Sequence, residues 1–500
     1  MRVEIIEWLN KRFHCNLTTK YYKDKIDVWR KWWEGYYKPF HHYQISDGQK
    51  LVYRDRYLLD MGKKVCEDWA SILLNDKTCI VVDNDAASVY LQGSDQTGGV
   101  FGDNKFWDRA NKLVEKAFWS GTGAVVLRLI NLHLDSAGQP IPDKRCKVKL
   151  NYLDARCIVP LSFDDDEITE VAFCSEVSRM GKSYLYLEMH TLDSNGYYVI
   201  ENQYFTFEYG VLKEAPLPDG MAASWHTHSD VPMFAIVKPN IENNLDPDEY
   251  PECGLGMSIL ENAIDCLKGV DLAYNNLCCD FKLGGKKVFM SDKLLQKDSD
   301  GRITTPDDAG QQLFMWVKQG TSIGGDGSNQ LIAEHNPTIR VTENTDGIQA
   351  QLDYLSFKVG FGTKHYQFNN ATQVTATQYA GDRQDLIQNA NKHYISVEAF
   401  LQQLVRAILW AGKNCIDSSI KEDAGVSVQF DDSIIIDKET ERARDKEDVR
   451  DGIMAKWEFR QKWYGEDEET AKAAIQAIED GAEPDDDELM GFDVRGAGDE

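Results

Sequence analysis

The chain has 500 residues, of which 42% are hydrophobic, so it can bury a large core, and a length of this order is typical of about three modules. Its 55 Lys and Arg are outnumbered by 82 Asp and Glu, which gives a formal net charge of -27. This balance does not supply the basic face that grips nucleic acid. No window approaches the roughly 18 consecutive apolar residues that a membrane-spanning helix needs.

The first half of the chain mixes helical and strand patterns. Apolar residues at helical spacing predict helices near residues 5–13, 21–37, 53–74 and 107–119. Strand patterns occupy residues 79–82, 124–134, 148–153, 158–161, 170–174, 183–190, 197–201 and 204–207. We therefore predict one α+β module over about the first 250 residues. Within it, Trp29, Trp32 and Trp33 are interpreted as packing residues, and a nucleobase-binding aromatic box is the alternative.

Three long helices organise the second half, at residues 258–281, 348–359 and 375–412. Ser258 and Glu261 have the spacing of a capping box, which predicts that the first helix begins there. The third helix opens at Thr375 with the same spacing. Gly360 and Gly362 follow the second helix and are expected to end it.

The segment between the first two long helices, residues 284–341, predicts a small module of its own. Its β-prone pieces lie at 287–290, 313–317 and 338–341, and Asp- and Gly-rich stretches separate them. The two helices would then form a stem that carries a compact head.

The C-terminal region predicts a small helical bundle followed by an acidic arm. Trp457, Phe459, Trp463 and the helix-prone residues 469–478 can form the bundle. Residues 464–500 contain fourteen acids and two bases. A stretch of this composition resists burial, so we expect residues 480–500 to be disordered.

No catalytic or metal-binding pattern in the sequence is complete. Gly-Lys-Ser at 181–183 ends like a phosphate-binding loop, but Glu176 stands where that motif needs a glycine. His-Thr-His at 226–228, followed by Asp230, could bind a metal, although surface histidines are the preferred interpretation. The acidic run 164–167 predicts a hairpin turn rather than a cation site. Eleven cysteines without a C-x-x-C motif are typical of reduced thiols. We expect no enzyme activity, no metal and no cofactor.

Two segments resemble a known family. Residues 53–71, YRDRYLLDMGKKVCEDWAS, and residues 254–272, GLGMSILENAIDCLKGVDL, are similar to the SPP1-type portal proteins of tailed bacteriophages. The chain length, the looped helix pair and the acidic helical C-terminus resemble that family too, so the likeness covers nearly the whole chain. It implies a multidomain α+β portal fold that assembles as a ring, usually of twelve subunits, at one capsid vertex.

The resemblance implies a division of the chain into a wing (1–253), a first stem helix (254–283), a clip (284–341), a second stem helix (342–362), a channel loop (363–374), a long wing helix (375–412), and a crown with an acidic tail (413–500). Double-stranded DNA would pass through the channel during packaging and ejection. The expected partners are the terminase large subunit, the head–tail adaptor, and the major capsid and scaffolding proteins, with no membrane. The expected location is the virion, after assembly in the host cytoplasm.

A DNA channel should hold its cargo weakly, because each neutralised phosphate adds affinity and therefore drag. The expected channel loop suits this need with mostly neutral polar side chains: Lys364, His365, Gln367, Asn369, Asn370 and Gln373. The stem adds lysines that could contact DNA, stay solvated or form ion pairs between subunits: Lys268, Lys282 and Lys358. The expected clip interface is Leu313, Phe314, Met315 and Trp316, of which two aromatics could instead form the core of the small module.

Two other classes of function remain open at this point. The chain contains 12 Trp and 22 Tyr besides its many acids, which is the composition of sugar-binding clefts. An enzyme acting on polysaccharide would additionally need paired carboxylates at a suitable separation. The other class is a capsid or scaffold component that binds only protein.

Overall fold

The computed structural model describes residues 3–17, 19–46, 50–94, 98–136, 138–208, 211–291, 299–300, 314–317, 332–368, 383–430 and 438–479. The chain forms two compact units, of which the first comprises Met1–Ala371 and Gln384–Phe430, and the second Thr372–Arg383 and Asp431–Glu500. Helices and strands both make up large parts of the described chain, which agrees with the expected α+β class. None of the helices in these residues is long and apolar enough to cross a membrane.

Buried aromatic side chains hold together the helices at the start of the first unit. These helices are α1 (Val3–Phe13), α2 (Thr19–Trp33), α3 (Lys38–His41), α4 (Met61–Leu73), α5 (Asp85–Gln92), α6 (Gly99–Asn104) and α7 (Phe106–Ser120). Trp29 and Trp32 of α2 are buried. Trp33 stacks on Trp119 of α7, with ring centroids 5.4 Å apart. The interpretation of the three tryptophans as packing residues is confirmed.

The predicted helix over residues 53–74 is too long at its start. Tyr53 lies in strand β2 (Leu51–Asp55), which pairs with β1 (His42–Ser46), and α4 begins only at Met61. The residues between are bound to the side chains of α8 (Ile264–Leu283). The Leu59 amide donates to Asp271 Oδ1 at 2.8 Å, and the Tyr57 amide donates to Asn275 Oδ1 at 3.1 Å. These tertiary hydrogen bonds replace those that a longer helix would make.

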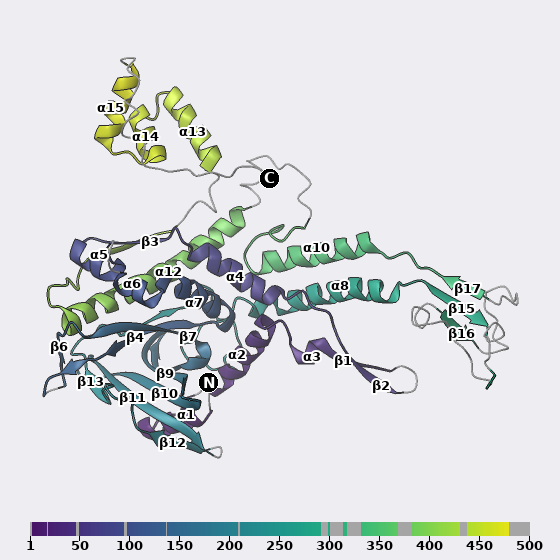
Figure 1. The fold of residues 1–500 in the computed structure, drawn as a ribbon, viewed down its shortest axis with the longest axis horizontal. Coiled ribbons are helices and arrows are strands. Elements are labelled where there is room, and N and C mark those ends of the chain that lie inside the picture. The colour runs from purple at the N-terminus through teal and green to yellow at the C-terminus, as the bar shows by residue number, and fades with distance from the viewer. Residues whose placement is uncertain are drawn as a thin grey trace. The chain divides into compact units, whose positions relative to one another are not determined.

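Two antiparallel sheets form the centre of the first unit (Figure 1). The larger has the strand order β12-β11-β10-β9-β8, with β13 beside β11, and the smaller has the order β14-β4-β7. Their strands are β4 (Gly123–Ile130), β7 (Lys147–Asp154), β8 (Ile158–Asp164), β9 (Glu167–Arg179), β10 (Lys182–Leu192), β11 (Tyr198–Glu208), β12 (Val211–Ala215), β13 (Ser224–His226) and β14 (Phe234–Val237). Ile5 and Leu9 of α1 pack against the larger sheet at Val159, Ala172 and Leu187.

Most of the expected strands are present, but the structure differs from the prediction in how some of them are divided and paired. The two strands expected at 197–201 and 204–207 are the single strand β11. The strand expected at 124–134 is β4 followed by the short β5 (His133–Leu134), which pairs with β6 (Pro140–Ile141). Strand β3 (Cys79–Val82), as expected from the sequence, pairs with β18 (Val426–Gln429), which the sequence did not reveal.

Helices α8 and α10 (Val341–Lys358) lie side by side in the first unit (Figure 1). Gly269 makes room for the contact, because a Cβ atom there would lie 2.2 Å from Gln351 Oε1. At the end away from the sheets, the Asp280 carboxylate accepts hydrogen bonds from Arg340 at 3.0 Å and from Asn344 at 2.8 Å. The expected helix pair is therefore present.

The capping box predicted at Ser258 is wrong, because α8 begins at Ile264 after a single turn of 3-10 helix, Glu261–Ala263. The Ser258 hydroxyl donates to the Phe118 carbonyl at 3.1 Å. The Glu261 carboxylate accepts from Lys25 Nζ at 2.6 Å and also from the indole of Trp29. Both side chains are thus engaged by other helices of the unit rather than by each other.

The excursion between α8 and α10 contains a three-stranded sheet of order β16-β15-β17. Its strands are β15 (Lys287–Ser291), β16 (Phe314–Val317) and β17 (Ile332–His335). The third expected strand, at 338–341, is wrong: the strand ends at His335, and Val341 already belongs to α10. Ile339 instead packs against Gly284. A Cβ atom added to Gly284 would lie 3.1 Å from the Cγ1 atom of Ile339.

Helix α12 (Gln384–Ala411) returns the chain to the sheets and packs against β14 and β4. Its buried side chains include Val397, Leu401 and Leu404. A short π-helical turn, Gly412–Ile416, follows it. The capping box predicted at Thr375 lies outside the described residues.

The second unit contains three helices in its described part, α13 (Lys438–Arg450), α14 (Lys456–Tyr464) and α15 (Glu468–Glu479). Trp463 Nε1 donates to Asp445 Oδ2 at 2.8 Å, and this joins α14 to α13. Lys472 of α15 lies 4.7 Å from the ring centroid of Trp457. The expected helical bundle is present, while the acidic residues 480–500 lie outside the described part of the chain.

Candidate functional site

The segment that follows α10, residues 359–368, contains the predicted channel-loop residues that the structure describes. We call this segment the loop base. It starts where α10 ends and is held by α4, from a distant part of the sequence, and by α12, which follows it in the chain.

Two glycines end α10 and turn the chain into the loop base. Gly360 has a φ of +90° and Gly362 a φ of +78°, a left-handed conformation that favours glycine. Side chains of α4 and α12 bind the first two carbonyls after α10. Trp69 Nε1 donates to the Val359 carbonyl at 3.1 Å, and Asn389 Nδ2 donates to the Gly360 carbonyl at 3.0 Å. The predicted termination by glycine is confirmed.

A stack of three rings fixes the first half of the loop base. The buried Phe361 ring stacks on Trp69 of α4, with centroids 4.7 Å apart and planes inclined by 18°. On its other side it stacks on the His365 imidazole, with centroids 4.3 Å apart and an angle of 12°. His365 therefore packs within the loop base and also borders the cavity described below, and its expected contact with DNA stays a prediction.

Tyr366 ties the second half of the loop base to α4. Its hydroxyl donates to Asp68 Oδ2 at 2.9 Å, and Gln349 Nε2 donates to its carbonyl at 2.8 Å. Burial, together with the nearby Asp68 charge, raises the pKa of Tyr366 far above its usual range. The phenol therefore stays protonated at neutral pH and remains a hydrogen-bond donor.

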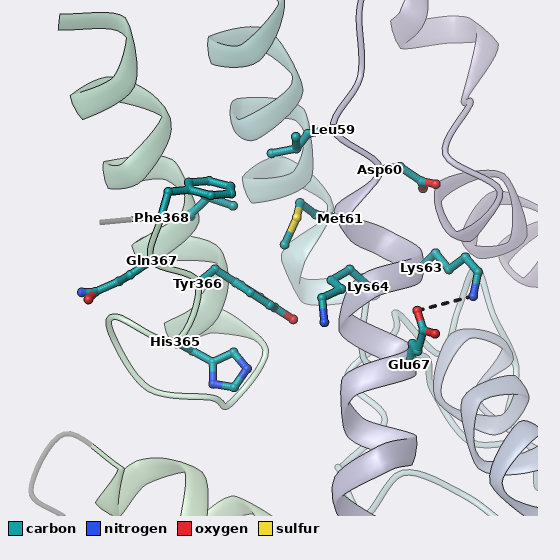
Figure 2. Close-up of a pocket in the computed structure, with 11 residues that line it drawn as sticks. Leu59, Asp60, Met61, Lys63, Lys64, Glu67, His365, Tyr366, Gln367 and Phe368 are labelled. Atoms are coloured by element: carbon teal, nitrogen blue, oxygen red, sulfur yellow. Dashed lines mark ion pairs between the residues drawn. The ribbon is translucent and has the colours of Figure 1, made fainter. Parts of the chain in front are cut away.

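An open cavity of about 500 Å³ lies between the loop base and the start of α4 (Figure 2). Leu59, Met61, Leu352 and Phe368 supply its apolar lining. Lys64 borders it beside Tyr366 and forms an ion pair with Asp68. The cavity is thus lined by apolar side chains, with charged side chains at its edge. Its lining contains no recognisable set of catalytic residues.

Half of the predicted channel-loop residues fall in the described chain. Lys364 and Gln367 are exposed, and Lys364 has a φ of +68°. His365 is the exception noted above. Asn369, Asn370 and Gln373 lie outside the described residues. The sequence analysis missed Phe361 and Tyr366, although two aromatic residues beside a polar run were a signal that this part of the segment is packed.

The stem lysines occupy two kinds of environment. Lys268 Nζ lies 2.8 Å from Asp265 Oδ1 on the same helix. Lys282 is exposed near the end of α8, and Lys358 is exposed in the last turn of α10. Their expected contact with DNA stays a prediction.

The predicted clip-interface residues lie on or beside β16. Strand β16 runs parallel to β15 and pairs Phe314 with Val288, Met315 with Phe289 and Trp316 with Met290. Leu313 lies outside the described residues.

The rejected chemical motifs have structural roles. Gly181 lies in the tight turn that joins β9 to β10, and Lys182 and Ser183 begin β10. Residues 164–167 form the predicted hairpin turn between β8 and β9, with Asp165 at a φ of +48°. His226 Nε2 lies 3.0 Å from Asp193 Oδ2, and its ring packs on His228. Among the residues that the structure describes, no group of three or more His, Cys, Asp or Glu side chains could hold a metal ion.

Comparison with protein-family models identifies a family that covers most of the chain. The family model described as phage portal protein, SPP1 Gp6-like, matches residues 7–485. A search of curated proteins finds no match. The matched range includes the sheets, α8 and α10, the loop base and the three helices of the second unit.

Proposed function

Because this chain belongs to the SPP1 Gp6-like family of phage portal proteins, we propose that twelve copies form a ring at one capsid vertex, with a central channel for DNA packaging and ejection. The family match, which spans residues 7–485 of the 500-residue chain, is the observation that carries the proposal. Portal proteins are structural rather than catalytic, and membership implies a place in the phage virion.

The domain layout proposed from the resemblance is compatible with the described elements. Residues 1–253 contain the two central sheets, and α12 packs back onto them, as a wing with a returning helix requires. Helices α8 and α10 would be the stem, the sheet β16-β15-β17 the clip, and α13 to α15 the crown. The clip, with Leu313 to Trp316, would contact the terminase large subunit and later the head–tail adaptor. The wing and crown would contact the capsid and scaffolding proteins.

The loop base supports a channel loop that contacts DNA briefly. Its first residues are fixed by the Trp69–Phe361–His365 stack and by Tyr366. Lys364, exposed among these anchored residues, would place one cation per subunit at the channel wall. Each copy carries a net charge of -27, so the ring as a whole repels the duplex. A few cations within an acidic ring give weak contacts that DNA can slide past.

A packaging assay tests the role of Lys364. The Lys364→Ala and Lys364→Glu variants should both form rings, and the amount of packaged DNA should fall several-fold, more for Glu than for Ala. His365 is left unchanged, because its loss would disturb the stack on Phe361. Lys147→Ala, which removes an exposed lysine of β7, is the matched control. Packaging at the wild-type level in both Lys364 variants would remove the loop from the proposed DNA path.

The structure lends no support to the polysaccharide enzyme. Trp29, Trp69 and Trp119 are among the largest fully buried side chains, so these aromatic residues are core residues rather than a sugar platform. A scaffold component that binds only protein would be distinguished by electron microscopy, because it would form no ring with an open centre.

A further inference from the structure

An open cavity of about 920 Å³ lies among α5, α6, α7 and the strand β7, which are neighbours in the first unit (Figure 1). Its volume is within the range of small-molecule sites, roughly 300–1,000 Å³. Val100, Val148 and Ile416 supply part of its apolar lining. It shares no lining residue with the cavity beside the loop base. We call it the β7 cavity.

Three cationic side chains line the β7 cavity. Arg109 comes from α7, and Lys147 and Lys149 come from alternate positions of β7, so the two lysines share one face of that strand. All three are exposed, and none forms an ion pair with a carboxylate within the described chain. Among the described lining residues, Asp103 is the acidic one. Because the chain as a whole carries a net charge of -27, this local excess of positive charge favours an anionic ligand.

Tyr90 of α5 adds a hydrogen-bond donor to the lining. Its ring is held against the π-helical turn after α12, because a Cβ atom added to Gly412 would lie 2.7 Å from the Cε1 atom of Tyr90. The hydroxyl is buried and has no hydrogen-bond partner among the described residues. Burial raises the pKa of Tyr90 far above its usual range, so the phenol stays protonated. A bound anion would supply the acceptor that this buried donor lacks.

The open edge of β7 beside the cavity is already covered by a side chain. Strand β7 is the last strand of its sheet, with β4 on its other side. Asn104 of α6 accepts from the Leu150 amide at 2.9 Å and donates to the Val148 carbonyl at 3.0 Å. An extended acidic peptide therefore cannot add to the sheet as a further strand at these residues. A compact anionic ligand suits the cavity better.

We propose that the β7 cavity binds a nucleoside phosphate, a compact molecule with an anionic end and an apolar ring system. The three cations would hold the phosphate groups, which guanidinium and ammonium groups bind through charge-assisted hydrogen bonds. The Tyr90 hydroxyl would donate to a phosphate oxygen, and Val100 and Ile416 would contact the base. The inference is one of binding alone, with no bond broken. It does not depend on ring formation and gives the cavity no part in moving DNA, so Lys147→Ala keeps its use as a control for packaging.

Isothermal titration calorimetry of the purified full-length protein with ATP tests the proposed ligand class. Pyrophosphate carries the anionic part alone, and adenosine carries the apolar part alone. We expect ATP to bind about tenfold more tightly than either, because each lacks one set of contacts. Equal affinity for ATP and pyrophosphate, equal affinity for ATP and adenosine, or no binding of ATP at millimolar concentration would each overturn the inference.

Substitutions of the cations locate the binding. Arg109→Gln and Lys149→Gln should each weaken ATP binding several-fold. Arg406→Gln is the matched control, because Arg406 is also exposed and forms no ion pair within the described chain. It lines a different cavity, where acidic residues are in excess: Asp230, Glu422 and Asp423. The control should leave ATP affinity unchanged. An equal loss in all three variants, or no loss in Arg109→Gln and Lys149→Gln, would contradict the assigned site.

Tyr90→Phe separates a binding role from a structural one. Without ligand the hydroxyl has no partner among the described residues, so its removal should not lower the melting temperature. The same change should weaken ATP binding several-fold, because a donor to phosphate is lost. A variant that is less stable but binds ATP as the wild type does would show that the hydroxyl serves packing, which would overturn its assigned role. Electron microscopy of the same samples shows whether rings form, so a failure of ligand binding is distinguishable from a failure of the proposed function.

Discussion

Tyr366 connects the segment after α10 to α4 through one partly buried hydrogen bond, from its hydroxyl to Asp68. Asp68 also forms an ion pair with Lys64, so it keeps a partner when the tyrosine hydroxyl is removed. The consequence for the loop base can therefore be tested without leaving a buried charge unpaired.

We predict that Tyr366→Phe lowers the free energy of unfolding by about 1 kcal/mol, the usual net contribution of such a hydrogen bond. Limited proteolysis should also become faster within the loop base. Tyr57→Phe, at a half-exposed tyrosine, is the matched control and should change neither measurement. Equal stability of Tyr366→Phe and the wild type would show that the hydroxyl does not anchor the loop base.

His393 of α12 makes the stability of the first unit depend on pH. It lies against Trp69 and Phe118, and its Nδ1 atom accepts from the Asn240 amide at 3.0 Å. Burial lowers the pKa of His393 to about 3, below its ordinary value of 6.5. The unfolded chain therefore binds a proton between these pH values that the folded chain does not, and stability is lost as pH falls through this range.

We predict that the wild type loses on the order of 2 kcal/mol of unfolding free energy through His393 between pH 7.5 and pH 5. His393→Gln keeps a hydrogen-bond acceptor but cannot be protonated, so its stability should fall less over the same interval. Urea unfolding of both proteins at the two pH values measures the difference. Parallel loss of stability in the two proteins would contradict the assigned role.

At the scale of single residues, exposure was easier to predict from the sequence than packing. Lys364 and Gln367 are exposed, as a polar run indicates. His365 was also predicted to be an exposed polar residue. The sequence does not show that Phe361 stacks on both Trp69 and His365. Trp69 is almost three hundred positions away in the chain, so this contact depends on the tertiary fold alone.

Gly360 decides how α10 passes into the loop base. Its φ of +90° is unfavourable for any residue with a Cβ atom, and that atom would lie 3.3 Å from Asn389 and 3.4 Å from Trp69. The asparagine and the tryptophan both bind the end of α10, so neither can move away freely.

We predict that Gly360→Ala lowers the free energy of unfolding by about 1–2 kcal/mol through left-handed strain. Gly102→Ala is the control: Gly102 lies in α6, has no positive φ, and has open space where a Cβ atom would be. This second change should leave stability equal or raise it by about 0.5–1 kcal/mol. Equal effects of the two substitutions in thermal unfolding would contradict the assigned role of Gly360.

At the scale of elements, the sequence predicted the middle of each helix and strand better than the residues at which it begins or ends. Periodicity locates α7, α8, α10 and most strands, because each has one face in a core. The ends of α4 and α8 were misplaced because Asp271 binds the amide before α4, and because Ser258 and Glu261 bind other helices. Such partners are distant in sequence, so local capping patterns could not reveal them. The third strand of the small sheet was misplaced for a similar reason, since Ile339 packs near Gly284 at the end of α8.

At the scale of the whole molecule, the family resemblance predicted the function, whereas composition only narrowed the possible classes. Charge and hydropathy excluded a basic DNA-gripping surface, but they left an enzyme and a scaffold component open. Family membership, shown by the match over residues 7–485, depends on the order of segments along nearly the entire chain. Ring formation is a property of many copies, and the residues that would join them are exposed in a single chain. For this reason it can be proposed from one subunit but must be measured on the assembly.

The most direct test of the portal assignment is the mass and symmetry of the purified full-length protein in solution. Native mass spectrometry together with electron microscopy should show a closed ring of twelve 56.9 kDa chains around an open centre. Particles of a single 56.9 kDa chain under all assembly conditions, with no central opening, would contradict the account.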